Sequence, residues 1–187
     1  STYRGTDMRG RANGARIRLA PQNQWAINNP DALAEVMTVL EEVQDEFNSG
    51  LSRGKQVSLA DVIVLAGNVG VEQAAEEFGV EVSIPFTPGR VDAIEGFLDE
   101  ASWSVMEPRH DGFRNYMADL GFMTPSQALI DKADMLNHTV SEMTVLLGGM
   151  RAMNANADDS DRGVLTDRPG VLSNDFFVNL LDMNTAW

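Results

Sequence analysis

The chain has 187 residues, of which 43% are apolar and 22% are charged, a balance that is typical of one folded domain and excludes a disordered chain. It has no cysteine, which excludes disulfides and thiolate metal sites and suits a reducing compartment, so we expect a cytoplasmic protein. A formal net charge of −14 argues against nucleic acid as a partner, and no apolar run approaches the length of a membrane span. We therefore expect a soluble, single domain over residues 1–187.

The first twenty residues differ in charge from the rest of the chain. They hold five arginines against Asp7 together with several glycines, so we expect an irregular segment there. The arginines could bind an anion, but the favoured interpretation is that they donate charge-assisted hydrogen bonds to the chain's own carboxylates or to a neighbouring domain. The residues concerned are Arg9, Arg11, Arg16 and Arg18, beside Gly10 and Gly14.

Three helical segments are predicted before residue 80. The first begins at Pro30, because proline is favoured in the first helical turn. Its apolar positions are Leu33, Val36, Met37, Leu40, Val43 and Phe47. The second, which we expect to be almost entirely buried, begins after Ser58 as N-cap, with Asp61 as the partner in a capping box. A third stretch over 71–78 ends at Gly79, and residues 80–86 are predicted to be a short extended piece.

Three more helices are predicted in the second half. One begins at Thr124-Pro125-Ser126-Gln127, which combines an N-cap with a capping-box glutamine, and another begins at Ser141. Its Gly148-Gly149 pair requires either very close packing or the end of the helix. A polar loop over 154–170 follows, and Ser173 is predicted to cap the last helix. The apolar side of that helix is Phe176, Phe177, Leu180 and Leu181. The fold class is therefore all-α, with about six helices and little or no β-structure.

Only two histidines, His110 and His138, are available as a general base or a metal ligand. Neither has a second histidine at metal-ligand spacing, so we interpret both as structural. The loop from Asn154 to Asp161 repeats oxygen ligands at alternate positions, as a calcium loop does, but its sixth and twelfth positions are Asp159 and Leu165. We predict no metal site and leave open whether an ion occupies this loop.

Six segments spread over nearly the whole chain carry a further pattern. They are STYRGTDMRGRANGARIRLAPQNQW, VSLADVIVLAGNVGVE, PFTPGRVDA, DGFRNY, EMTVLLGGMRAMNAN and GVLTDRPGVLSNDFFVNLLDM. In this order they resemble the C-terminal half of bifunctional haem catalase-peroxidases. The resemblance implies the mainly helical, plant-type haem-peroxidase fold, which the family holds twice: an N-terminal half carries haem b and a related C-terminal half does not.

The resemblance also implies what this chain lacks. In the haem-bearing half, the histidine that ligates iron follows a Gly-Gly pair, and Met150 stands at that position here. The carboxylate partner of that histidine is an aspartate, and Ser173 stands at its position here. The distal Arg-Trp-His trio would precede Ser1, and the family continues beyond Trp187, so the fold is expected to be truncated. We therefore predict no catalytic, cofactor-binding or metal-binding residue.

Three hypotheses for function follow. The favoured one is a non-catalytic domain that packs against the haem-bearing N-terminal half, supports its active site and helps to form the homodimer that the family generally shows. One alternative is a partner-docking or ligand-binding module. The least favoured is a peroxidase in its own right, with haem bound through His110, His138 or Met150.

Overall fold

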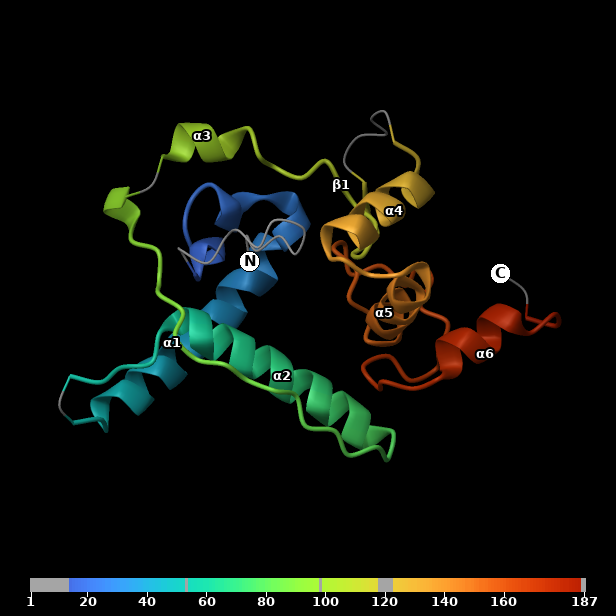
Figure 1. Cartoon of the computed structure of the whole chain (residues 1–187), viewed down its shortest axis with the longest axis horizontal. Coiled ribbons are helices and arrows are strands. Elements are labelled where there is room, and N and C mark those ends of the chain that lie inside the picture. The colour runs from blue at the N-terminus through green and yellow to red at the C-terminus, as the bar shows by residue number, and fades with distance from the viewer. Residues whose placement is uncertain (1–13, 53, 98, 118–122, 186–187) are drawn as a thin grey trace. The chain divides into compact units, whose positions relative to one another are not determined.

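The computed structural model describes residues 14–52, 54–97, 99–117 and 123–185 (Figure 1). Within them lie six α-helices and one two-stranded antiparallel ribbon, which confirms the mainly helical fold class. The helices are α1 (Pro30–Ser49), α2 (Leu59–Glu77), α3 (Glu100–Ser104), α4 (Pro125–Met135), α5 (Val140–Ala152) and α6 (Asp175–Leu181), and the strands are β1 (His110–Asp111) and β2 (Tyr116–Met117). None of these helices combines the length and apolar character needed to cross a membrane.

The fold divides into two compact units. The first comprises Ser1–Val69 and Ile84–Glu107, and the second comprises Gly70–Ser83 and Pro108–Trp187. Helix α2 supplies residues to both units. That the 187 residues behave as one domain stays a prediction.

The core of the first unit joins α1 to the start of α2. Met37, Leu59 and Val62 form a buried cluster. Leu33 and Leu40 of α1 pack against it. The predicted start of α1 at Pro30 is confirmed. The predicted apolar face is buried only along one edge, because Val36, Val43 and Phe47 remain exposed.

Helix α2 differs from its prediction in its length, its burial and its capping box, but not in its N-cap. It runs without a break to Glu77, so the separate helix over 71–78 is wrong: an interior glycine such as Gly67 or Gly70 costs only about 1 kcal/mol and does not end a helix. The helix is not almost entirely buried, since Leu65 and Val69 are exposed. The Ser58 hydroxyl accepts from the Asp61 N–H at 3.1 Å, which confirms the N-cap.

The capping box at α2 is wrong, because the Asp61 carboxylate does not turn back to Ser58 and instead binds Gly89 and Arg90. The predicted end of the helix is confirmed, since Gly79 has a φ of 90° and its N–H donates to the Glu76 carbonyl at 2.7 Å. Residues 80–86 form no strand in the described structure, because no neighbouring strand pairs with them.

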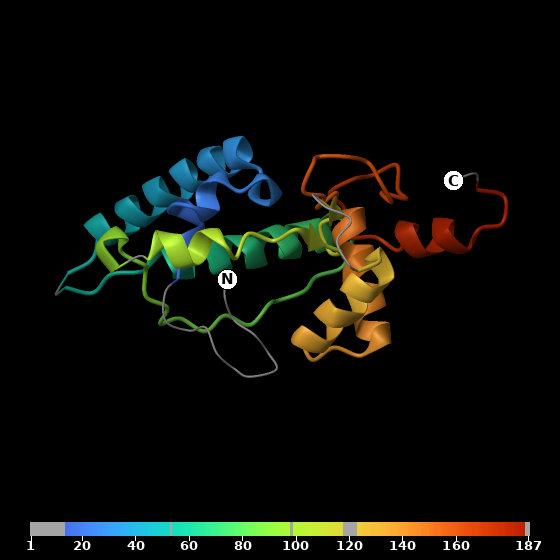
Figure 2. The same cartoon turned by 90° about the horizontal axis from the view of Figure 1, so that it is seen from above.

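The second unit is built around α4 and α5, which lie side by side in Figure 1 and Figure 2. Both helices begin with a complete capping box, formed by Thr124 with Gln127 and by Thr139 with Glu142. The first confirms the prediction. The second makes Thr139 the N-cap, so α5 begins at Val140, one residue before the predicted Ser141, because the threonine three residues before Glu142 is the better cap. Phe113, Ala133 and Met143 form the buried cluster of this unit.

Helix α6 is the last element. Its N-cap is Asn174, so the prediction that Ser173 caps it is wrong by one residue; the Ser173 hydroxyl accepts from the Asp175 N–H at 3.3 Å. The predicted apolar side is only partly buried, because Phe176 is covered whereas Leu180 and Leu181 are exposed.

Candidate functional site

The Gly148-Gly149 pair of α5 marks the segment that the resemblance singled out. A Cβ atom added to Gly148 would overlap the Phe177 ring, with its Cε2 at 2.8 Å, and would lie 2.9 Å from Cδ1 of Phe176. These two rings meet edge to face, with centroids 5.2 Å apart. A Cβ at Gly149 would meet only Leu172, at 3.4 Å. The helix continues to Ala152, so close packing is the reason for Gly148.

Met150 follows this pair but belongs to a different environment. Because successive residues of an α-helix are rotated by about 100°, Met150 lies on nearly the opposite side of α5 from Gly148. It packs against the cluster that contains Phe113 and Met143. Its carbonyl accepts from the Ala155 N–H at 2.9 Å. The partly buried Met150 side chain thus packs against the hydrophobic core of this unit.

Ser173 belongs to a network that orders the start of α6. Its side chain is buried and its hydroxyl is used by Asp175. The Asp175 carboxylate accepts from the Thr166 hydroxyl at 2.7 Å and from Arg168 Nη2 at 2.9 Å. The hydrogen bonds from Thr166, then Arg168 and Ser173, hold the pKa of Asp175 below its usual value. Ser173 therefore helps to fix the loop that precedes α6.

Sequence reasoning missed Arg151, which is buried beside Met150. It donates hydrogen bonds to the carbonyl of Phe113 and, at 3.0 Å, to that of Gly112. Burial lowers the pKa of Arg151, and the nearby Asp111 carboxylate partly offsets this effect. Arg151 thereby anchors the turn between β1 and β2 to α5. The available signal was a single arginine near the end of an otherwise apolar stretch of helix.

The described arginines of the N-terminal segment bind differently from the prediction. The Arg16 guanidinium lies 3.8 Å from the centroid of the Trp103 ring, and Arg18 Nη2 donates to the Ala93 carbonyl at 2.9 Å. Within the described residues neither side chain contacts a carboxylate, so the expected pairing with the chain's own carboxylates is wrong for these two, and a partner in a neighbouring domain stays a prediction. Burial lowers the pKa of Arg16, and its Nε has no hydrogen-bond partner in the described structure. Arg9, Gly10 and Arg11 lie outside the described residues.

Gly14, the glycine beside these arginines, is a site of close approach. A Cβ there would overlap that of Ala60 and would lie 3.0 Å from the Val91 carbonyl oxygen. The Gly14 N–H donates to the same carbonyl at 2.7 Å. Gly14 therefore joins the N-terminal segment to α2 by packing and does not form part of an anion cradle.

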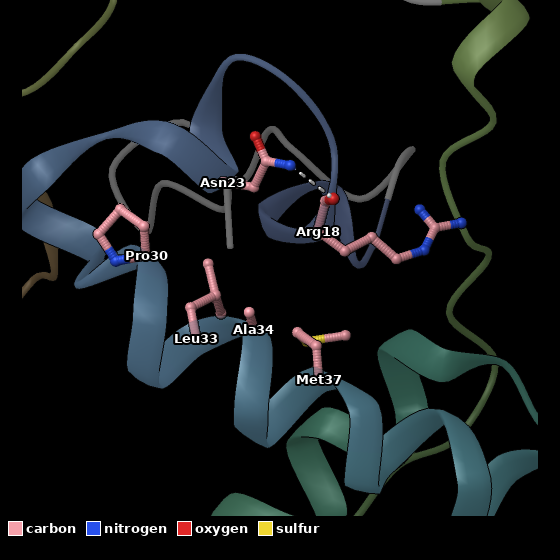
Figure 3. Close-up of a pocket in the computed structure, with 6 residues that line it drawn as sticks. All are labelled: Arg18, Asn23, Pro30, Leu33, Ala34 and Met37. Carbon is pink, nitrogen blue, oxygen red and sulfur yellow. Dashed lines mark hydrogen bonds between the residues drawn. The ribbon is translucent and has the colours of Figure 1, made fainter.

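A small cavity of about 140 Å³ lies between this segment and α1. Figure 3 shows Asn23 donating to the Arg18 carbonyl, at 3.2 Å, above the apolar side chains of α1. The cavity is lined by Arg18, Asn23, Pro30, Leu33, Ala34 and Met37. The Arg18 guanidinium extends away from Leu33 (Figure 3). This cavity is below the roughly 300 Å³ at which small-molecule sites begin.

The two histidines lie in the short ribbon and just beyond α4, and their structural role stays a prediction. His110 is paired with Met117 in the short ribbon, and the His138 N–H donates to the Ala133 carbonyl at 2.9 Å, just beyond α4. Over the residues that the structure describes, no group of three histidine, aspartate or glutamate side chains is arranged to hold a metal ion. The loop after α5 is held by its own hydrogen bonds, since Asn156 Nδ2 donates to the Arg162 carbonyl at 3.2 Å.

The surroundings of Met150 do not fit the proximal haem site that the resemblance implies for the haem-bearing half. An imidazole ligand has a second nitrogen that a carboxylate can hold, whereas a thioether has none. Met150 is partly buried and packs against the core, and the Ser173 hydroxyl already accepts a hydrogen bond from the Asp175 N–H. That these two residues stand where the family has its histidine and aspartate remains a prediction.

Comparison with known proteins gives the family. The pattern of the peroxidase family, described as Peroxidase, matches residues 6–187. The chain is 60% identical over 187 residues to "Catalase-peroxidase 2" of Shewanella sp. (strain MR-4), covering 100% of this chain and 25% of that protein. With the same coverage, it is 56% identical to "Catalase-peroxidase 2" of Legionella pneumophila (strain Lens) and 58% identical to "Catalase-peroxidase" of Granulibacter bethesdensis.

The chain thus spans about a quarter of the length of these curated relatives. The family match covers nearly all of it, and its fold is mainly helical. The chain therefore belongs to the peroxidase family and is similar over its full length to one part of the catalase-peroxidases.

Proposed function

We propose that this chain is the C-terminal, non-catalytic portion of a catalase-peroxidase. In the intact, cytoplasmic protein, haem b in the N-terminal half supplies the chemistry that removes hydrogen peroxide. This chain supports the geometry of that half and takes part in the homodimer. The proposal accounts for a peroxidase relative in which aromatic rings fill the space beside Gly148 of α5 and in which Met150 follows the Gly-Gly pair.

The packing of Gly148 against Phe177 is the observation that supports this proposal most directly. The space next to this glycine is filled by two aromatic rings, and the side chain after the pair, Met150, contributes to a hydrophobic core. A segment that is packed on both sides provides stiffness. Arg151 adds two hydrogen bonds to backbone carbonyls, so the same helix also fixes the turn after β1.

Two measurements test the proposal. Haem is titrated into this chain while the Soret band is recorded, and we expect no sharp band at one equivalent. The chain is then mixed with a separately produced haem-bearing half, and we expect peroxide turnover by that half to rise. Tight, stoichiometric haem binding, with turnover by this chain alone that replacement of His110, His138 or Met150 abolishes, would support an independent peroxidase.

Two matched variants of α5 test whether the rise in peroxide turnover depends on the packing of this helix. Gly148→Val introduces a side chain into the Phe177 ring, so this variant should lose the ability to raise turnover. Gly149→Ala adds a methyl group at ordinary contact distance from Leu172 and should retain it. If both variants raise turnover equally, or if the unaltered chain does not raise it, the proposed role is wrong.

A further inference from the structure

The outer face of α1 carries an apolar stripe that nothing in the described structure covers. The stripe consists of Val36, Val39, Val43 and Phe47, which are 53%, 54%, 49% and 57% exposed. Their spacing of three or four residues places them within an arc of about 80° on an α-helix. Single exposed apolar side chains are common, but a row of four along one helix is typical of a packing surface.

The helix that presents this stripe is held in place. Asn48 binds Val57, in the loop that leads to α2, with both ends of its amide: Oδ1 accepts from the Val57 N–H at 2.8 Å and Nδ2 donates to the Val57 carbonyl at 3.1 Å. Gln44 donates to the same carbonyl at 2.9 Å. Met37, on the neighbouring edge of the helix, is buried in the core. The stripe is therefore a preformed surface, which lowers the entropic cost of covering it.

Charge along α1 restricts what can cover the stripe. The helix contains six acidic residues and no basic one. They are Asp31, Glu35, Glu41, Glu42, Asp45 and Glu46. A second copy of this chain would bring two such acidic helices together without any basic residue between them, and repulsion at this range is only partly screened by salt. The fitting occupant is apolar along one face and basic at its edges.

The length of the relatives indicates where such an occupant is found. This chain matches about a quarter of their length, so most of a catalase-peroxidase lies outside the matched part. We propose that the α1 stripe packs against an apolar segment with basic flanks that belongs to the same polypeptide and lies outside these 187 residues. The inference rests on the proposed function, because it takes the chain to be one portion of a longer protein.

Thiol reactivity tests this assignment, because the chain has no cysteine of its own. Val43→Cys places one thiol in the stripe, and the matched control Glu42→Cys places one on the exposed acidic side of the same helix. Alkylation by a maleimide is timed in this chain and in the intact holoenzyme that contains it. We expect both thiols to react rapidly in the chain, and only the thiol at 43 to slow, by about tenfold or more, in the holoenzyme.

Two outcomes would overturn the assignment. Equal reactivity of the thiol at 43 in the chain and in the holoenzyme would show that no other segment covers the stripe. If alkylation of the thiol at 43 in the isolated chain slows as the concentration of the chain rises, the occupant is a second copy. Neither measurement depends on haem or on turnover. The thiol can therefore be protected in the holoenzyme even if the chain does not raise turnover, and turnover can rise even if the thiol is not protected.

Discussion

The Asp61 carboxylate accepts a 2.8 Å hydrogen bond from Nη1 of Arg90, which lies 29 residues later in the chain. The same carboxylate accepts from the Gly89 N–H at 2.7 Å. In return, the Asp92 carboxylate accepts from the N–H groups of Leu59 and Ala60, each at 2.8 Å, at the start of α2. A carboxylate of α2 thus accepts hydrogen bonds from residues 89–90, and a carboxylate of the same loop accepts them from the free N–H groups at the start of α2.

Asp61→Ala should lower the free energy of unfolding by about 2–3 kcal/mol, because it leaves the Gly89 N–H without its acceptor and removes the ion pair with Arg90. Chemical denaturation of the purified chain measures this value. Asp45→Ala, an exposed carboxylate on α1, is the control and should change stability by less than about 0.5 kcal/mol. Equal effects of the two substitutions would contradict the structural role of Asp61.

Acid should weaken the contribution of Asp61 in a defined direction. Burial opposes its ionisation, but the hydrogen bonds from Gly89 and Arg90 outweigh burial and hold the pKa of Asp61 below its usual value. A carboxyl of this kind stabilises the fold above its unfolded pKa of about 4 and ceases to do so as the pH falls through its folded pKa.

The stability difference between the unaltered chain and Asp61→Asn should therefore be constant above about pH 5 and shrink as the pH falls below about 4. Denaturant titrations at a series of pH values measure this difference. A difference that stays constant down to the lowest pH at which the chain folds would be inconsistent with the lowered pKa.

The contact between Gly148 and Phe177 predicts a non-additive pair of substitutions. Gly148→Ala should cost about 1–3 kcal/mol, because the new methyl group meets the Phe177 ring. In a Phe177→Ala background, the same substitution should cost clearly less. The double-mutant cycle is measured by denaturation, with Gly149→Ala as the control that shows no such coupling. A Gly148→Ala penalty that is unchanged in the Phe177→Ala background would show that the ring is not the obstacle.

The same replacement at two buried arginines should affect stability to different extents. Arg151→Met removes two hydrogen bonds to the carbonyls of Phe113 and Gly112 and should destabilise the chain by about 2–3 kcal/mol. Arg16→Met removes a buried cation that stacks on Trp103 without a carboxylate partner in the described structure, so its effect should stay within about 1 kcal/mol. Thermal and chemical unfolding of both variants distinguish them, and a larger loss for Arg16 than for Arg151 would reverse this assignment.

Local signals in the sequence predict the boundaries of several helices. Thr124 and Gln127 form the capping box that their spacing indicates, and Gly79 ends α2 because a left-handed residue is needed there. The same signals fail where a distant residue competes: Asp61 has the spacing of a capping-box partner, but the backbone of Gly89 binds its carboxylate. Which apolar residues of α1 are buried also depends on elements far along the chain.

In the candidate site, too, local signals in the sequence do not identify contacts with distant residues. The Gly-Gly pair indicates a close approach, but only the structure identifies Phe177 as the neighbour. The role of Arg151 depends on carbonyls 38 and 39 residues earlier in the chain, and no local spacing encodes such a contact. Arg16 binds an aromatic ring in place of the expected carboxylate, because Trp103 lies on a helix that the sequence pattern did not predict.

The mutual contacts between the start of α2 and residues 89–92 also constrain the order of folding. The N–H groups of Leu59 and Ala60 find their acceptor only when Asp92 has returned from more than thirty residues downstream. The first turn of α2 and the returning loop are thus completed in one cooperative step that closes a long stretch of chain, and such non-local closure slows folding. A nascent chain that ends before Asp92 would leave this helix start frayed and accessible to chaperones.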